Sequence, residues 1–213
     1  MVEIKICGFK RRKDIIDAIN LGIRWIGLNF YEKSPRYIEL KETKELIENL
    51  PPNVKKIGVF VNPDEKKLYE IVKKIKLDGI QLHGNEPFSM IERFKKNFPN
   101  KIVIKAIRVK TKEEVLKKIK YYKISDFFLL DVYTKDKLGG TGKLIDESKI
   151  EKNKLPFNKI FIAGGITPEN VKDIIKKYKP FGIDVASGVE IAPGIKDIEK
   201  MRRLIEEVKN VSR

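Results

Sequence analysis

The chain has 213 residues, and its 46 lysines and arginines against 30 aspartates and glutamates give a formal net charge of +16. This length suffices for one domain with a sizeable core, or for two small ones. The single cysteine excludes an internal disulfide, and no apolar run approaches the roughly 20 residues of a membrane span. The N-terminus, with Glu3 and Lys5, lacks the apolar stretch of a signal peptide. We therefore expect a soluble protein of the reducing cytoplasm, with no membrane partner.

A positive charge of this size attracts polyanions, so nucleic acid must be considered, although the same field would steer a phosphorylated substrate. Lysine pairs recur on nearly every helix-like segment, usually with Glu or Asp nearby, as on solvated helix faces. A nucleic-acid site would interleave aromatic with basic residues on one face, and the sequence shows no such pattern. We expect no nucleic-acid partner. Richness in Lys, Glu and Ile with little Cys and Met is typical of thermophilic proteins.

In chain order, short apolar or β-branched runs alternate with longer amphipathic ones. Most of the short runs are continuously apolar, as in parallel strands covered on both faces. The predicted strands are 2–6, 25–30, 56–61, 79–82, 101–106, 126–130, 159–163 and 182–185. The predicted helices are 12–21, 41–50, 64–75, 87–98, 111–122, a weaker one at 146–152, 168–178 and 196–209. Start signals include Asp64, Thr111 followed by Glu114, and Thr167-Pro168-Glu169.

Eight strand–helix units without a linker predict an α/β fold, a single (β/α)8 TIM barrel over residues 1–213. The alternative is an open doubly wound sheet. A dinucleotide site in such a sheet would need a Gly-x-Gly-x-x-Gly turn after the first strand, and the sequence has none there.

In a barrel of this kind, residues at the C-terminal ends of the strands carry the chemistry. Cys7 follows the first strand, where a thiol can transfer protons if its thiolate is stabilised, although a free Cys is also a small apolar packing residue. Asp131 closes an apolar run, and partial desolvation would favour its neutral, proton-donating form. Alternatively, Asp131 could cap a helix or pair with a nearby lysine. Two different proton-transfer groups without a metal-ligand cluster favour an isomerase over a hydrolase or oxidoreductase.

Glycine-rich turns follow the last three strands. Backbone N–H groups in such turns, just ahead of a helix, bind phosphate oxygens in many barrels. Glycines also simply make tight turns. The turns are Gly139-Gly140-Thr141-Gly142, Gly164-Gly165 and Ser187-Gly188.

Nine short stretches, in register over nearly the whole chain, carry a family resemblance. They are KICG (5–8), SPR (34–36), GVFVN (58–62), QLHG (81–84), LLD (129–131), GGTGK (139–143), AGGITPENV (163–171), DVASGVE (184–190) and PGIKD (193–197). On these motifs the chain resembles phosphoribosylanthranilate isomerase, the barrel enzyme of tryptophan biosynthesis.

The resemblance implies an Amadori rearrangement of N-(5-phosphoribosyl)anthranilate, a small phosphorylated substrate, without cofactor or metal. It makes Asp131 the general acid on the ring oxygen and Cys7 the general base on the second sugar carbon. Arg36 would clamp the anthranilate carboxylate, and Asp184 would meet a ribose hydroxyl. The backbones around Gly164, Gly165, Ala186 and Ser187 match the family's phosphate cradle. The glycine-rich turns described above add Gly140, Thr141, Gly142 and Gly188 to the expected phosphate-binding residues. We expect a monomer or a homodimer.

His83, the only histidine, either lies near the substrate or is hydrogen-bonded within its loop. The family commonly shows Phe-Asp-Trp where this chain has Ile145, Asp146 and Glu147, so the sixth helix could pack differently. Related barrels, such as ribulose-phosphate epimerase or indole-glycerol-phosphate synthase, would share the cradle. They would need metal ligands or a catalytic Lys–Glu set in place of Cys7 and Asp131.

Overall fold

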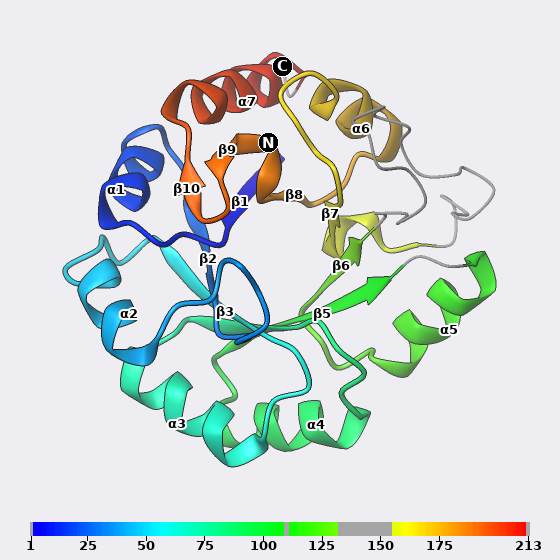
Figure 1. The fold of residues 1–213 in the computed structure, drawn as a ribbon. Helices are drawn as coiled ribbons and strands as arrows, with labels where there is room; N and C mark the ends of the chain where they lie inside the picture. Colours follow the sequence, from blue (N-terminus) through cyan, green and yellow to red (C-terminus); the bar gives the residue numbers. More distant parts are fainter. Residues whose placement is uncertain (1, 109–110, 132–154, 212–213) are drawn as a thin grey trace.

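Eight parallel strands close into a barrel in chain order, and β8 pairs with β1 (Figure 1). The computed structural model describes residues 2–108, 111–131 and 155–211. The predicted (β/α)8 barrel is confirmed, and every predicted strand lies within two residues of an observed one. The strands are β1 (Glu3–Cys7), β2 (Trp25–Asn29), β3 (Lys55–Phe60), β4 (Gly79–Leu82), β5 (Ile102–Arg108), β6 (Phe127–Asp131), β7 (Ile160–Ala163) and β8 (Gly182–Val185).

An outer ring of helices covers the barrel (Figure 1). Two predicted start signals are confirmed: the side chain of Asp64 accepts from the amide of Lys67, and that of Thr111 accepts from the amide of Glu114. The predicted helix at 146–152 lies outside the described residues. The helices are α1 (Arg12–Asn20), α2 (Leu40–Ile47), α3 (Glu65–Ile75), α4 (Phe88–Asn97), α5 (Lys112–Tyr121), α6 (Val171–Tyr178) and α7 (Ile198–Val211).

The barrel interior is filled at its N-terminal end by aromatic side chains. The Trp25 ring packs edge-on against Phe127, Phe161 and Phe181, with centroids 5.4 to 6.2 Å apart. Burying each such side chain contributes roughly 1.5–3 kcal/mol. These residues lie at or near the starts of their strands, so bulky packing is concentrated away from the C-terminal rim. Inside the barrel, smaller and polar side chains lie at the C-terminal rim. A site can therefore form at the rim.

The start of the last helix differs from the prediction. The pattern predicted a helix from Lys196, but Lys196 lies in a short antiparallel hairpin of β9 (Glu190–Ala192) and β10 (Ile195–Lys196). The carboxylate of Asp197 accepts from the amides of Glu199 and Lys200, so the helix begins only after this cap. Helix α6, predicted from Pro168, likewise begins late, at Val171, after a turn closed by hydrogen bonds to the carbonyl of Thr167.

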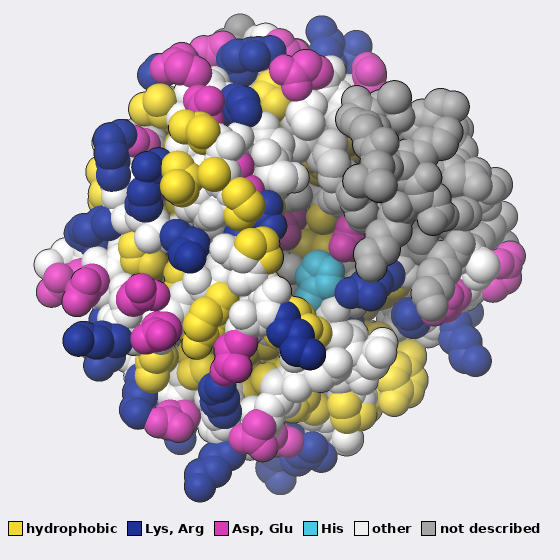
Figure 2. Space-filling model, viewed as in Figure 1, with side chains coloured by type: hydrophobic (Ala, Val, Ile, Leu, Met, Phe, Trp, Pro, Cys, Tyr) yellow, Lys and Arg dark blue, Asp and Glu magenta, His cyan; other side chains and the backbone are white. Residues whose placement is uncertain are grey.

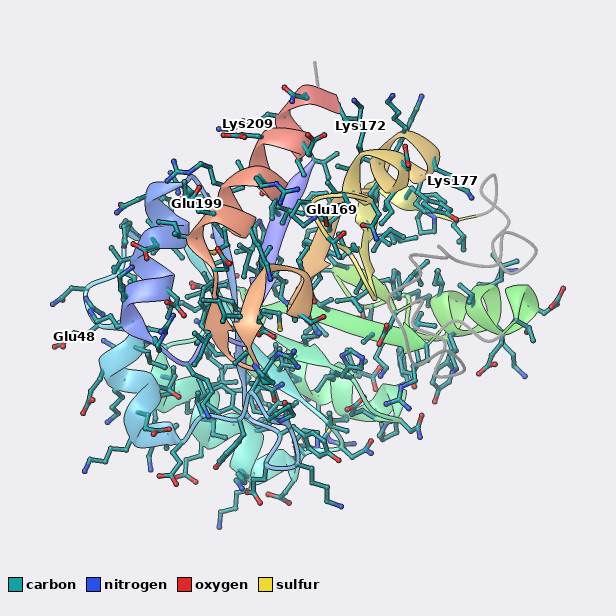
Figure 3. The ribbon with its side chains drawn as sticks, turned by 45° about the horizontal axis from the view of Figure 1, so that its top comes forward. Glu48, Glu169, Lys172, Lys177, Glu199 and Lys209 are labelled. Atoms are coloured by element: carbon teal, nitrogen blue, oxygen red, sulfur yellow. The ribbon has the colours of Figure 1, made fainter. Side chains whose placement is uncertain are left out.

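Charged side chains of both signs lie on the outer helices. Figure 3 shows Glu48, Lys172 and Lys209 projecting outward from the ring. Lys13 pairs with Asp17 one helical turn away, which is typical of a solvated helix face. No helix in the described part of the chain is long and apolar enough to cross a membrane. The same residues hold no group of three or more His, Cys, Asp or Glu side chains that could bind a metal ion.

Candidate active site

Cys7 is the last residue of β1, and its thiol lies over a glycine of the neighbouring strand. Its register partner is Gly27 of β2, where a Cβ atom would lie 2.6 Å from the Cys7 sulfur. Any larger residue at position 27 would therefore displace the thiol. The Cys7 side chain is partly exposed at the barrel mouth. The predicted rim position is confirmed, and the absence of a side chain at Gly27 provides the space for it.

Two buried ammonium groups lie near this thiol. Burial raises the pKa of Cys7 and the Asp184 carboxylate adds to that, while Lys5 and Lys196 lower it; the net pKa is above the ordinary value. Lys5 is fully buried, two residues before Cys7 on β1, and its Nζ lies 3.0 Å from Oδ1 of Asp184. Burial alone would lower the pKa of Lys5, but Asp184 and Cys7 outweigh it and raise the pKa. The thiolate form of Cys7 therefore depends on these two lysines.

Asp131 is the last residue of β6 and is partly exposed at the same rim. The Nε2 atom of His83, which directly follows β4, lies 3.3 Å from Oδ2 of Asp131. The other ring nitrogen lies 3.3 Å from the amide nitrogen of Gln81, which can only donate. With the Gln81 amide in this orientation, Nδ1 of His83 is the acceptor and Nε2 is the nitrogen that faces the carboxyl group. In Figure 2 the histidine, cyan, lies near the centre of this face.

Arg36, in the loop after β2, is held by Ser34 of the same loop and by Glu190, the first residue of β9. Its backbone amide donates to Oγ of Ser34, and its guanidinium donates from Nε and Nη2 to the carboxylate of Glu190, at 2.9 and 2.6 Å. The aliphatic part of Arg36 crosses Gly8, where a Cβ atom would lie 2.4 Å from its Cδ. Gly8 also has φ +78°, which favours glycine. The predicted carboxylate clamp therefore lies beside Cys7, and its guanidinium forms a bidentate pair with Glu190.

The glycine-containing turns after β7 and β8 touch each other. Gly164 and Gly165 both have positive φ, at 98° and 64°. A Cβ atom on Gly188 would lie 1.8 Å from the carbonyl oxygen of Ile166, so only glycine permits this approach. Gly165 and Ser187 are exposed. The two loops predicted to bind phosphate thus form one continuous surface.

The remaining predicted site residues have different settings. Asp184 is the penultimate residue of β8, 8% exposed, and its Oδ1 accepts a hydrogen bond from Lys5. Ala186 precedes the short 3-10 helix Ser187–Val189, beside the glycine turns. The turn containing Gly140, Thr141 and Gly142 lies outside the described residues.

Among the described residues, three buried charged side chains around Cys7 and Arg36 were not identified from the sequence: Lys5, Glu190 and Lys196. Each occurs within a family-like motif, KICG, DVASGVE or PGIKD, and that was the available signal. Their burial, at 0%, 7% and 3% exposed, marks them as part of the interior. Charged side chains are rarely buried this far unless paired, and all three are paired.

A closed (β/α)8 barrel with Cys7, His83 and Asp131 at its C-terminal rim has the arrangement of a barrel enzyme. The family model described as N-(5'phosphoribosyl)anthranilate (PRA) isomerase matches residues 4–207. The isomerase of Caldanaerobacter subterraneus is 42% identical over 213 residues, covering 99% of this chain and 100% of its own. The chain belongs to the N-(5'-phosphoribosyl)anthranilate isomerase family, enzymes of tryptophan biosynthesis, as the motifs predicted.

Solved structures agree with this assignment. The isomerase from Thermotoga maritima is 33% identical, with a TM-score of 0.88, and the match covers 99% of this chain and 100% of that one. A second isomerase structure holds reduced 1-(o-carboxyphenylamino)-1-deoxyribulose 5-phosphate. It is 31% identical, with a TM-score of 0.85 and the same coverage of both chains.

Proposed function

We propose that this protein converts N-(5-phosphoribosyl)anthranilate to 1-(2-carboxyphenylamino)-1-deoxyribulose 5-phosphate by an Amadori rearrangement, with Asp131 as general acid and Cys7 as general base. The observation that carries the proposal is that these two groups end β6 and β1 at one barrel mouth. Three strand-to-strand steps, through β7 and β8, separate β6 from β1, so a substrate in the mouth can reach both.

In the first step, Asp131 donates a proton to the furanose ring oxygen. The bond from that oxygen to the first sugar carbon breaks, and the anilino nitrogen supplies the electron pair that forms the Schiff base. His83, 3.3 Å from the carboxyl group, orients Asp131 toward the ring oxygen. A carboxyl group at a partly desolvated rim is suited to this donation.

In the second step, the Cys7 thiolate removes the proton on the second sugar carbon. The electrons of that C–H bond form the C1–C2 double bond and neutralise the nitrogen, giving an enolamine. The enolamine tautomerises to the ketone, with a proton added at C1 and one lost from the hydroxyl at C2. The ammonium groups of Lys5 and Lys196 favour the thiolate needed for this step.

The rest of the site would bind the two anionic ends of the substrate. Arg36 suits the anthranilate carboxylate because its planar guanidinium forms directional hydrogen bonds. The backbones of Gly164, Gly165 and 186–188 would bind the phosphate, since turns of this kind present N–H groups to anions. Asp184 would meet a ribose hydroxyl. The product-like ligand in the related structure carries the same carboxylate and phosphate groups.

Replacement of Asp131 by Asn tests this assignment. The amide cannot donate an acidic proton, so turnover of phosphoribosylanthranilate, followed by the loss of its fluorescence, should fall by on the order of 1000-fold. The matched control is Asp126→Asn, just before the same strand, where the carboxylate pairs with Lys95 away from the rim. Asp126→Asn should retain kcat within a few-fold. Comparable kcat values for the two variants would contradict the role of Asp131.

A further inference from the structure

Lys196 is a buried cation surrounded by oxygen acceptors of the active-site loops. Its Nζ lies 2.6 Å from the carbonyl oxygen of Cys7, 2.7 Å from Oε1 of Glu190 and 3.4 Å from the carbonyl oxygen of Ala186. A buried ammonium is tolerated only with such partners. One side chain of β10 therefore contacts the end of β1 and the loop after β8.

Glu190 joins this cation to the proposed carboxylate clamp. Its Oε1 accepts from Lys196, from the amide of Gly194 and from Nε of Arg36, and its Oε2 accepts from Nη2 of Arg36. Burial raises the pKa of Glu190, but Arg36 and Lys196 outweigh this and keep the pKa low. Glu190 is thus a buried carboxylate shared by two cations.

Glu190 and Lys196 together contact the three segments that the proposed chemistry uses. They are the end of β1 with the base, the loop after β2 with the clamp, and the loop after β8 with the phosphate surface. Figure 1 shows the β9–β10 hairpin inside the ring of helices, near β1 and β8. The hairpin interrupts the regular strand–helix alternation at the last unit, and its polar residues point to these loops.

We propose that Glu190 and Lys196 are positioning residues, which hold the Arg36 guanidinium, the Cys7 backbone and the Ala186 loop in one fixed arrangement. This inference rests on the proposed function, because the fixed arrangement matters only if Arg36 binds the substrate carboxylate and Cys7 acts as the general base. Arg36 has a long flexible side chain, and the bidentate pair with Glu190 fixes the plane of its guanidinium. The two residues act through Arg36 and Cys7.

Among the described residues, the charged groups that act electrostatically on the Cys7 thiol come from four elements. They are Lys5 on β1, Asp184 on β8, Arg36 in the loop after β2, and Lys196 on β10. Lys196 therefore has an electrostatic effect on the thiol in addition to its hydrogen bond to the Cys7 carbonyl. Removing its charge should make the thiolate harder to form.

The first test follows alkylation of Cys7 by iodoacetamide as a function of pH. Because Cys7 is the only cysteine, the signal reports on it alone. Lys196→Met should move the midpoint of this pH profile upward by about one pH unit. Lys196→Arg, which keeps the positive charge, should bring the midpoint most of the way back to the wild-type value. The matched control is Lys200→Met, whose ammonium donates to the Glu190 carbonyl from α7. An unchanged midpoint in Lys196→Met, or an equal shift in Lys200→Met, would overturn the role of Lys196.

The second test measures steady-state kinetics of Glu190→Gln with phosphoribosylanthranilate. Loss of the bidentate partner should raise KM by about tenfold or more while kcat falls less, since a misplaced clamp weakens ground state and transition state alike. If Glu190→Gln does not fold by circular dichroism, Glu190→Asp serves instead, with a smaller KM rise. An unchanged KM in the folded variant would overturn the role of Glu190. If the wild type itself lacked turnover, the proposed function would fail, while the alkylation test would still decide the role of Lys196.

Discussion

The imidazole of His83 and the carboxyl group of Asp131 face each other across the barrel rim, with Nε2 of the histidine 3.3 Å from Oδ2 of the aspartate. The two residues come from the ends of β4 and β6, separated by β5. Both side chains are partly exposed, so the pair is accessible from the barrel mouth. This relationship supports an orienting role for the histidine, whereas its position in the sequence left a loop hydrogen bond equally open.

Replacing His83 by Gln should lower kcat by on the order of tenfold, with little change in KM, because Asp131, the proposed general acid, loses an orienting contact and keeps its proton. Steady-state kinetics measure both constants. The effect should be much smaller than that of Asp131→Asn. A loss as large as that of Asp131→Asn would make the histidine itself the acid, and no loss would remove it from the site.

Gly27 should be intolerant of a methyl group. In Gly27→Ala the added Cβ would lie 2.6 Å from the sulfur of Cys7 and 2.9 Å from its Cα, so the end of β1 must shift. Overpacking of this kind typically costs about 1–3 kcal/mol of unfolding free energy. We expect a lower melting temperature and a fall in kcat of at least about tenfold. A variant with wild-type turnover would show that the base tolerates displacement.

The pH dependence of the reaction should follow the thiol. Because the pKa of Cys7 is raised above its ordinary value, mostly by burial, the protonated form dominates at neutral pH and the reactive thiolate grows as pH rises. The value of kcat/KM should therefore increase with pH through this pKa. In Lys5→Met the thiol loses a neighbouring ammonium, so the rising limb should move to higher pH.

The check on this prediction is the pH profile of kcat/KM beside the pH profile of Cys7 alkylation. Both should shift in the same direction in Lys5→Met. Lys13→Met is the control, since Lys13 pairs with Asp17 on the outside of α1. A limb that moved to lower pH, or that moved equally in Lys13→Met, would contradict the electrostatic account.

The order of the strands, and several of the residues at their C-terminal ends, could be predicted because both depend on local signals in the sequence. Apolar runs mark parallel strands, and residues such as Cys7 and Asp131 directly end two of them. The turns at 164–165 and 187–188 could likewise be predicted from the glycines they contain. Topology then placed all of these on one rim without any knowledge of contacts.

The polar interior of the site could not be predicted in the same way. Arg36 and Glu190 are 154 residues apart, and Cys7 and Lys196 are 189 apart, so no sequence spacing links them. A lysine near the start of an amphipathic pattern is read as a solvated helix residue, which is why Lys196 was assigned to the last helix. Only the closed barrel shows that this side chain is buried beneath the loops of the candidate site.

The most direct test of the central claim, that Cys7 is the general base, is the turnover of Cys7→Ser with phosphoribosylanthranilate carrying hydrogen or deuterium at the second sugar carbon. Serine preserves the size of the side chain but is a far weaker base, so kcat should fall by on the order of 100-fold or more, with the melting temperature retained. Proton removal should then limit the rate, and the deuterated substrate should react several-fold more slowly still. Turnover within a few-fold of wild type, or a slow reaction without an isotope effect, would contradict the assignment.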